Sequence, residues 1–162
     1  MRKNTVTIHL KPYSAHYLRL KYTFKGNIID LPRKSKIRST FLLCLSKDYS
    51  ETDHKELSGY TDAVEVFVCD KLFVKHGNNV NHKFASLFNS VLEEKIKNEA
   101  FHIINLIRLK HNMKPKEAIL EFQSIYGFAD TFSFDAIKQD YYRSLREAEE
   151  IILKTQTVTK HN

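Results

Sequence analysis

Residues 84–107, FASLFNSVLEEKIKNEAFHIINLI, carry the longest periodic pattern in the chain. Apolar side chains recur in it every three or four residues, which is the period of an α-helix with one apolar face. The expected inner face consists of Phe84, Leu87, Phe88, Val91, Leu92, Ile96, Ile103, Ile104 and Ile107. We expect one long helix of about eight turns, beginning near Asn81, to form the backbone of the fold.

Two further helices are expected after this one. The pattern breaks at residues 111–114, Pro115 suits a first helical position, and Gly127 suits a helix end. Ser133 can cap a third helix, with Asp135 in its first turn. The expected inner faces are Ala118, Ile119, Phe122 and Ile125 in the second helix, and Ile137, Tyr141, Leu145, Ile151 and Ile152 in the third.

The part before residue 80 alternates between strand and helix patterns. Apolar and polar residues alternate as in half-buried strands, whereas Pro12 and Ser35 each mark the start of a helix. Strands are expected at 5–10, 28–31 and 64–68, the last with an extension at 72–74, and helices at 12–25 and from Ser35 to Leu45. Residues 47–61 are polar and are interpreted as an exposed loop.

These patterns predict an α+β fold in a chain of 162 residues. About three strands and two helices form a basic α/β part at residues 1–79. A three-helix part built on the long helix follows at residues 80–155, with a flexible tail at 156–162. A chain of this length fits one domain with a substantial core.

Positive charge is concentrated at the amino-terminal end. The chain has 26 Lys and Arg against 19 Asp and Glu, a net charge of +7. Residues 1–50 hold 11 basic and 2 acidic side chains, a net +9, so the remainder sums to −2. Such asymmetry favours a polyanionic partner, DNA or RNA above all, although basic residues can also simply solvate a surface.

A phosphate-binding site is predicted at the start of the second expected helix. Four cations and a capping serine gather there, at Arg33, Lys34, Ser35, Lys36 and Arg38. Helix-terminal N–H groups and cations attract phosphate, and such contacts position a backbone without specifying sequence. The alternative interpretation is a solvated loop with a serine cap.

Residues 11–25 provide further candidate nucleic-acid contacts. The cations Lys11, Arg19, Lys21 and Lys25 are interleaved with the aromatic residues Tyr13, Tyr17, Tyr22 and Phe24, a mixture found where bases stack beside a charged groove. Aromatics at helical spacing also pack into cores, and that alternative is favoured here. The sequence leaves open whether these cations share a face with residues 33–38.

A helix-turn-helix-like hairpin is expected over residues 116–143. Lys138, Arg143 and Arg146 are its candidate DNA contacts. The connection at 128–132 is longer than the usual three or four residues, and residues 134–150 carry a net charge of −2. A structural hairpin is therefore the favoured interpretation.

No catalytic, metal or cofactor motif is found. The eight histidines lack zinc-ligand spacing, and no Gly-rich phosphate loop or nucleophile elbow is present. Cys44 and Cys69 each lie in an apolar run and are expected to be buried free thiols in a reducing compartment. No apolar run approaches the length of a membrane span, so we expect a cytoplasmic protein without a membrane partner. Because catalytic, metal and cofactor motifs are missing, we expect neither enzymatic activity nor a cofactor.

The carboxy-terminal half resembles an uncharacterised family of small bacterial prophage and mobile-element proteins. The resemblance covers residues 64–143. It rests on the segments VEVFV at 64–68, KHG at 75–77, FN at 88–89, EEKIK at 93–97, AI at 118–119, FQ at 122–123, YGF at 126–128 and SFDAIKQDYYR at 133–143. It implies a bacterial or phage intracellular protein that acts on DNA or on another element-encoded protein, and it assigns no activity to any residue.

Together these observations predict a non-enzymatic nucleic-acid-binding or regulatory protein of a mobile element. The alternative is a protein-interaction or assembly module, in which the long helix shares its apolar stripe with a second copy or with an element-encoded partner.

Overall fold

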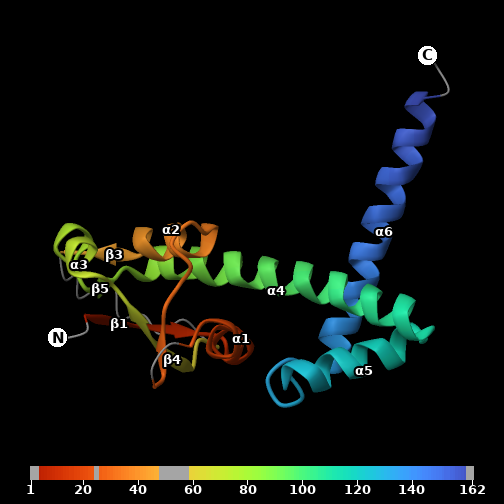
Figure 1. Cartoon of the computed structure of the whole chain (residues 1–162). Coiled ribbons are helices and arrows are strands. Elements are labelled where there is room, and N and C mark those ends of the chain that lie inside the picture. The colour runs from red at the N-terminus through yellow and green to blue at the C-terminus, as the bar shows by residue number, and fades with distance from the viewer. Residues whose placement is uncertain (1–3, 24–25, 48–58, 160–162) are drawn as a thin grey trace. The chain divides into compact units, whose positions relative to one another are not determined.

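A computed structural model describes residues 4–23, 26–47 and 59–159 of the chain. These residues form six helices and five short strands (Figure 1), which confirms the predicted α+β class. The backbone divides into two compact units, Met1–Ile96 and Lys97–Asn162. The division lies inside the long helix, whereas the sequence pattern places the change at residue 80.

A three-stranded sheet forms the centre of the amino-terminal unit. Strand β1 (Thr5–Leu10) pairs antiparallel with β4 (Asp62–Phe67), and β2 (Ile28–Ile29) pairs parallel with the other edge of β4. In this register Thr5 faces Phe67. The alternation predicted for both long strands is confirmed, because one side of each is buried, with Val6, Ile8, Leu10, Val64 and Val66 in the core.

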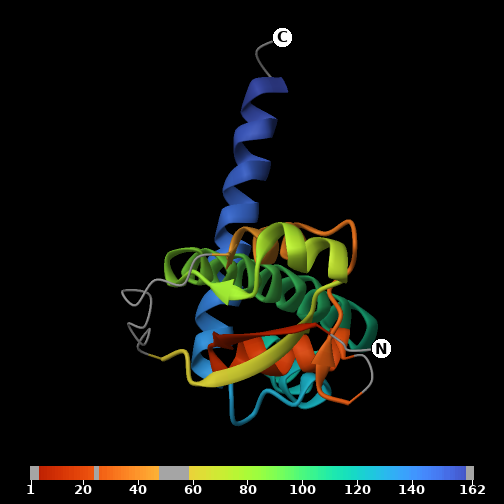
Figure 2. The ribbon, with the colours of Figure 1, turned by 90° about the vertical axis from the view of Figure 1, so that its left-hand side faces the viewer.

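Helices cover this sheet. Helix α1 (Pro12–Tyr22) begins at the expected proline, and α2 (Lys36–Leu43) begins after the Ser35 cap. The first half of the long helix α4 (His82–His111), as far as Ile96, lies over one face of the sheet (Figure 1, Figure 2). Helix α2 packs against α4, with the rings of Phe41 and Phe88 5.7 Å apart.

The predicted strand extension at 72–74 is wrong. These residues belong to helix α3 (Asp70–His76), because the Cys69 carbonyl accepts hydrogen bonds from the N–H groups of Leu72 and Phe73 and so starts a helical turn. The three consecutive apolar residues fit either period, and the alternation of β4 does not continue past Val68.

A two-stranded ribbon, absent from the sequence analysis, joins the ends of α2 and α3. Strands β3 (Leu45–Ser46) and β5 (Asn79–Val80) pair antiparallel. Gly77 ends α3 with φ of +89°, and a Cβ atom at this position would collide with the Ser46 carbonyl oxygen. Only glycine satisfies both conditions.

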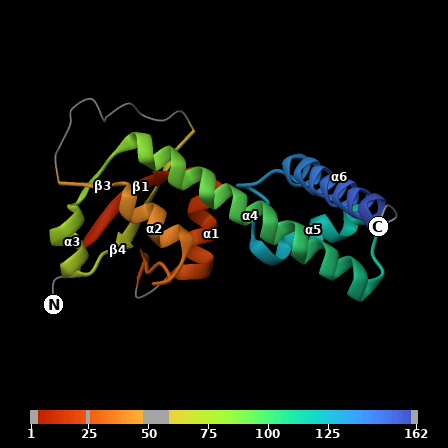
Figure 3. The same cartoon turned by 90° about the horizontal axis from the view of Figure 1, so that it is seen from above.

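The carboxy-terminal unit contains the end of α4, α5 (Pro115–Tyr126) and α6 (Phe134–Thr159). Helices α5 and α6 pack together (Figure 3). Gly127 ends α5 in the left-handed conformation, and the Ser133 hydroxyl accepts a hydrogen bond from Ala136 N at 3.3 Å, as the capping patterns predict. The core of the unit includes Ile104, Ile107, Ala118, Ile119, Phe122, Phe128, Phe132, Ile137 and Tyr141.

Several residues expected on inner faces are exposed. They are Phe84, Leu87, Ile125, Ile151 and Ile152. In α5, Gln123 and Tyr126 are buried in place of Ile125. The Gln123 amide donates a hydrogen bond to the Phe132 carbonyl at 2.8 Å, which satisfies this polar group inside the core. Helix α6 continues to Thr159, so residues 156–159 are helical where a flexible tail is expected.

Candidate nucleic-acid interface

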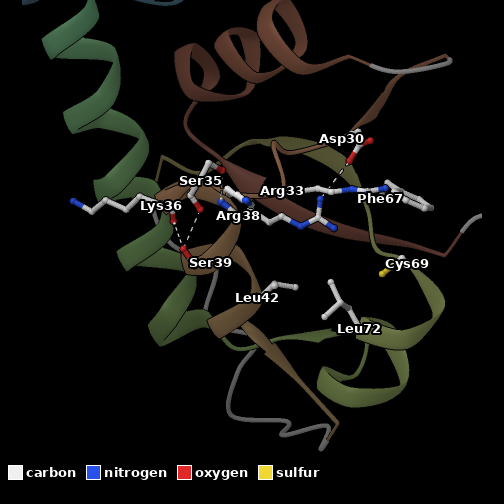
Figure 4. Close-up of a pocket in the computed structure, with 11 residues that line it drawn as sticks. Asp30, Arg33, Ser35, Lys36, Arg38, Ser39, Leu42, Phe67, Cys69 and Leu72 are labelled. Carbon is white, nitrogen blue, oxygen red and sulfur yellow. Dashed lines mark hydrogen bonds and ion pairs between the residues drawn. The ribbon is translucent and has the colours of Figure 1, made fainter.

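An open pocket of about 760 Å³ lies in the amino-terminal unit, at the start of α2 and the end of β4 (Figure 4). All four cations of the predicted phosphate site line it. The complete lining is Asp30, Arg33, Lys34, Ser35, Lys36, Arg38, Ser39, Leu42, Phe67, Cys69 and Leu72. We call this site the basic pocket.

Arg33 and Lys34 supply its accessible positive charge. Both lie in the turn between β2 and α2, and both are exposed. Within the described residues, neither side chain forms an ion pair or a hydrogen bond. The two cations are therefore accessible from solvent at the rim of the site.

Arg38 plays a different part. Its guanidinium donates a hydrogen bond to the Leu31 carbonyl at 2.7 Å and lies 3.6 Å from an Asp30 carboxylate oxygen, and its side chain is only 12% exposed. These contacts tie the loop before α2 to the helix. Arg38 thus shapes the basic pocket and neutralises Asp30 within it.

Lys36 points away from the other lining residues, toward α4 (Figure 4). Its ammonium nitrogen lies 3.2 Å from a carboxylate oxygen of Glu94. Both side chains are exposed, so water screens the pair and its net contribution is small. Lys36 therefore contributes less positive charge to the basic pocket than its position in the sequence suggests.

The hydroxyl groups of the site bind the backbone. Ser35 Oγ accepts from Arg38 N at 3.1 Å and donates to the Pro32 carbonyl at 2.8 Å, whereas Ser39 Oγ donates to the Ser35 carbonyl at 3.0 Å. Each hydroxyl has a single proton to donate. The main role of Ser35 is accordingly the helix cap, which leaves the cations as the predicted phosphate ligands.

Four apolar or weakly polar side chains, which no local sequence pattern predicts as neighbours, complete the lining of the basic pocket and form its apolar wall. Leu42, Phe67, Cys69 and Leu72 come from α2, the end of β4 and the start of α3. Phe67 is half-buried and occupies an outward position of β4, in line with Glu65. An aromatic residue on the polar side of an alternating strand is the sequence signal that could have identified this wall.

The cations of residues 11–21 lie elsewhere in the unit. Lys11 Nζ lies 2.7 Å from Glu93, and Arg19 lies 3.6 Å from Asp62 while also donating to the Ala63 carbonyl at 2.9 Å. Asp62 begins β4 and Phe67 ends it, a separation of about 16 Å along the strand. None of Lys11, Arg19 and Lys21 lines the basic pocket.

The tyrosines of residues 11–25 have mixed exposure. Tyr17 is buried and its ring lies 6.3 Å from that of Tyr22 in an edge-on arrangement, as the core interpretation predicts. Tyr13 and Tyr22 are half-buried, and Phe24 lies outside the described residues.

The third group of predicted contacts belongs to α6. Lys138, Arg143 and Arg146 are exposed. Arg143 lies 3.4 Å from Asp140, whose other carboxylate oxygen lies 3.3 Å from Lys97. These residues belong to the carboxy-terminal unit, and the small pocket lined by Phe101, Phe132 and Ile137 in that unit includes none of the three.

The two thiols differ in exposure. Cys44 is buried, donates toward the carbonyls of Thr40 and Phe84, and has a pKa that burial raises to about 12. Cys69 is half-buried in the basic pocket, which corrects the expectation that both thiols are buried. Neither is in a disulfide.

No group of three or more His, Cys, Asp or Glu side chains suited to hold a metal ion occurs among the described residues. A search for a membrane-spanning helix over the same residues finds none of sufficient length and apolarity.

Comparison with known proteins finds no relative. No protein-family model matches the chain, and neither a curated protein nor a solved structure shows significant similarity to it. The resemblance to prophage and mobile-element proteins therefore stays a prediction.

Proposed function

We propose that the chain is a non-enzymatic nucleic-acid-binding protein that holds backbone phosphates at the basic pocket. The observation that carries the proposal is the pair Arg33 and Lys34, two exposed adjacent cations that line one concave site. Arginine can bind phosphate through two donors at once, whereas lysine acts as a point charge beside it.

The distribution of charge between the two units supports this proposal. Residues 1–96 contain 16 basic and 10 acidic side chains, a net +6, whereas residues 97–162 contain 10 and 9, a net +1. The amino-terminal unit thus carries most of the net charge, which favours attraction of a phosphate polymer to the unit that contains the basic pocket.

Salt-dependent binding tests the proposal. Affinity for a DNA oligonucleotide is measured between about 50 and 200 mM salt for the natural chain and for Arg33→Ala/Lys34→Ala. Loss of two phosphate contacts should lower the magnitude of the log–log slope by about 1.4 to 1.8 and weaken binding at every salt concentration.

The matched control is Lys110→Ala/Lys116→Ala. These two cations are also exposed, lie outside the basic pocket, and belong to the carboxy-terminal unit. The control should retain the natural slope. An equal loss in both double variants would contradict a site at the basic pocket, and absence of binding by the natural chain would refute the proposed function.

Protection of Cys69 offers an independent measurement. This thiol is half-buried in the basic pocket, so a bound oligonucleotide should slow its reaction with a thiol reagent. Cys44 serves as the internal reference, because its burial already makes it unreactive. Unchanged labelling of Cys69 at saturating DNA would argue against occupation of the basic pocket.

A second candidate function is self-association through α4. Phe84 and Leu87 lie one turn apart on this helix and are exposed at 39% and 46%. Light scattering during size-exclusion chromatography tests it. A dimer that Leu87→Glu converts to a monomer would favour assembly, whereas a monomer at all concentrations would exclude it.

A further inference from the structure

We infer that the basic pocket takes an unpaired nucleotide of a single strand, with its phosphate at Arg33 and Lys34 and its base against Phe67. This inference rests on the proposed function and narrows it from nucleic acid in general to single strands. It follows from the composition of the basic pocket, which joins cations to an aromatic ring in one concavity.

Phe67 is placed to contact a base. It ends β4, faces Thr5 in the sheet register, and is half-buried, so part of its ring is accessible. Leu42 and Leu72 line the same pocket, and Lys36 lies at the opposite end of the group from Phe67 in Figure 4. An aromatic ring beside cations is the combination with which proteins stack bases of a single strand next to its backbone.

The charge within the basic pocket is compatible with one or two phosphates. Asp30 is its one carboxylate, and the contact with Arg38 at 3.6 Å compensates it. Arg33 and Lys34 then remain for the ligand. A volume of about 760 Å³ falls in the range of pockets that hold small organic ligands, which suits a nucleotide unit.

The concave shape argues against a duplex. Proteins read duplex DNA with an element that protrudes into a groove, and bases stacked inside a duplex do not present their faces. Phe67 lies instead in the lining of a hollow, where only a base that has left the stack can reach it. Duplex DNA should meet the exposed cations and leave the aromatic ring unused.

The chain contains no tryptophan, which makes a direct test possible. Phe67→Trp preserves an aromatic face and introduces a single indole whose fluorescence should be quenched when a base stacks on it. The probes are a 12-nucleotide deoxyadenylate strand, an abasic strand with the same number of phosphates, a 12-base-pair duplex, and free deoxyadenosine monophosphate.

We expect the adenine strand to quench the indole and to bind about tenfold more tightly than the abasic strand. Phe67→Leu should remove this advantage while leaving the affinity for the abasic strand and the salt slope unchanged. Because Phe67 faces outward and is not part of the core, both variants should fold, and thermal unfolding checks that they do.

The outcomes separate this inference from the proposed function. Equal affinity for adenine and abasic strands, or tighter binding of the duplex, would overturn the inference and leave phosphate binding standing. Free deoxyadenosine monophosphate binding as tightly as the 12-nucleotide strand would overturn the assignment to a strand. No binding of any probe would refute both proposals.

Discussion

The ammonium nitrogen of Lys36 lies 3.2 Å from a carboxylate oxygen of Glu94, so α4 neutralises one cation at the edge of the basic pocket. The neighbouring residue Glu93 holds Lys11 at 2.7 Å in the same way. Two consecutive carboxylates of α4 thus reduce the positive charge of the amino-terminal unit.

Replacement of Glu94 should therefore strengthen nucleic-acid binding. In Glu94→Gln, Lys36 loses its counterion and becomes available to phosphate, and we expect about two- to fivefold tighter binding at low salt. The gain should vanish as salt rises, because both side chains are exposed and screened. Glu121→Gln, an exposed carboxylate on α5, is the control and should show a smaller gain.

Removal of the Asn89 side chain should destabilise the amino-terminal unit. The buried amide donates to the Ala85 carbonyl at 3.0 Å and accepts from Lys11 N at 3.4 Å, which links α4 to the junction of β1 and α1. Asn89→Ala leaves the partly buried Lys11 N–H group without this acceptor, and we expect a loss of about 1–3 kcal/mol in denaturant unfolding. Ser90→Ala, at an exposed neighbouring position, should change stability by less than about 0.5 kcal/mol.

The Cys44 thiol should make the chain less stable at high pH. Burial raises its pKa from 9.0 to about 12, so between these values the unfolded chain releases a proton that the folded chain keeps. Stability then falls by about 1.4 kcal/mol for each pH unit above 9.

Comparison with Cys44→Ala isolates this effect from other groups that titrate. Between pH 8 and pH 10.5, unfolding in guanidinium should show the natural chain losing about 2 kcal/mol more than the variant. Parallel losses in the two proteins would mean that the folded thiol ionises as readily as the unfolded one.

Tyr141 should stabilise the carboxy-terminal unit through its hydroxyl. This group accepts from Arg108 at 2.5 Å and donates to Asn105 Oδ1 at 2.8 Å, and its ring is buried. Tyr141→Phe deprives a half-buried guanidinium of a partner, and we expect thermal and denaturant unfolding to show a loss of about 1–3 kcal/mol. The exposed neighbour Tyr142 provides the comparison, and Tyr142→Phe should be close to neutral.

The sequence predicts those helices and strands that have a periodic apolar pattern and a recognisable residue at one end. The alternation of Val6, Ile8 and Leu10 identifies β1, and Ser35 identifies the start of α2. The segment Leu72–Val74 has three consecutive apolar residues, which fit a strand and a helix equally well, and tertiary context decides for a helix. The ribbon of β3 and β5 has two residues in each strand, too few for any periodic signal.

The cations of the candidate site can be predicted from the sequence, but the residues that they contact and the apolar side chains beside them cannot. The local concentration of charge identifies Arg33 and Lys34, and both line a pocket. That Lys36 turns toward Glu94, 58 residues away, depends on the packing of α2 against α4. The wall that includes Phe67 likewise forms only when three distant segments meet, which no local pattern encodes.

The pairing of β1 with β4 has a consequence for how the chain acquires its structure. Thr5 and Phe67 are partners in the sheet, and 61 residues separate them in the sequence. During synthesis β1 therefore cannot pair with β4 until the ribosome has released most of the amino-terminal unit. Closing so large a loop costs entropy before any contact compensates it, whereas the helical hairpin of α5 and α6 joins near neighbours. The half of the molecule that is made first should be the slower to fold.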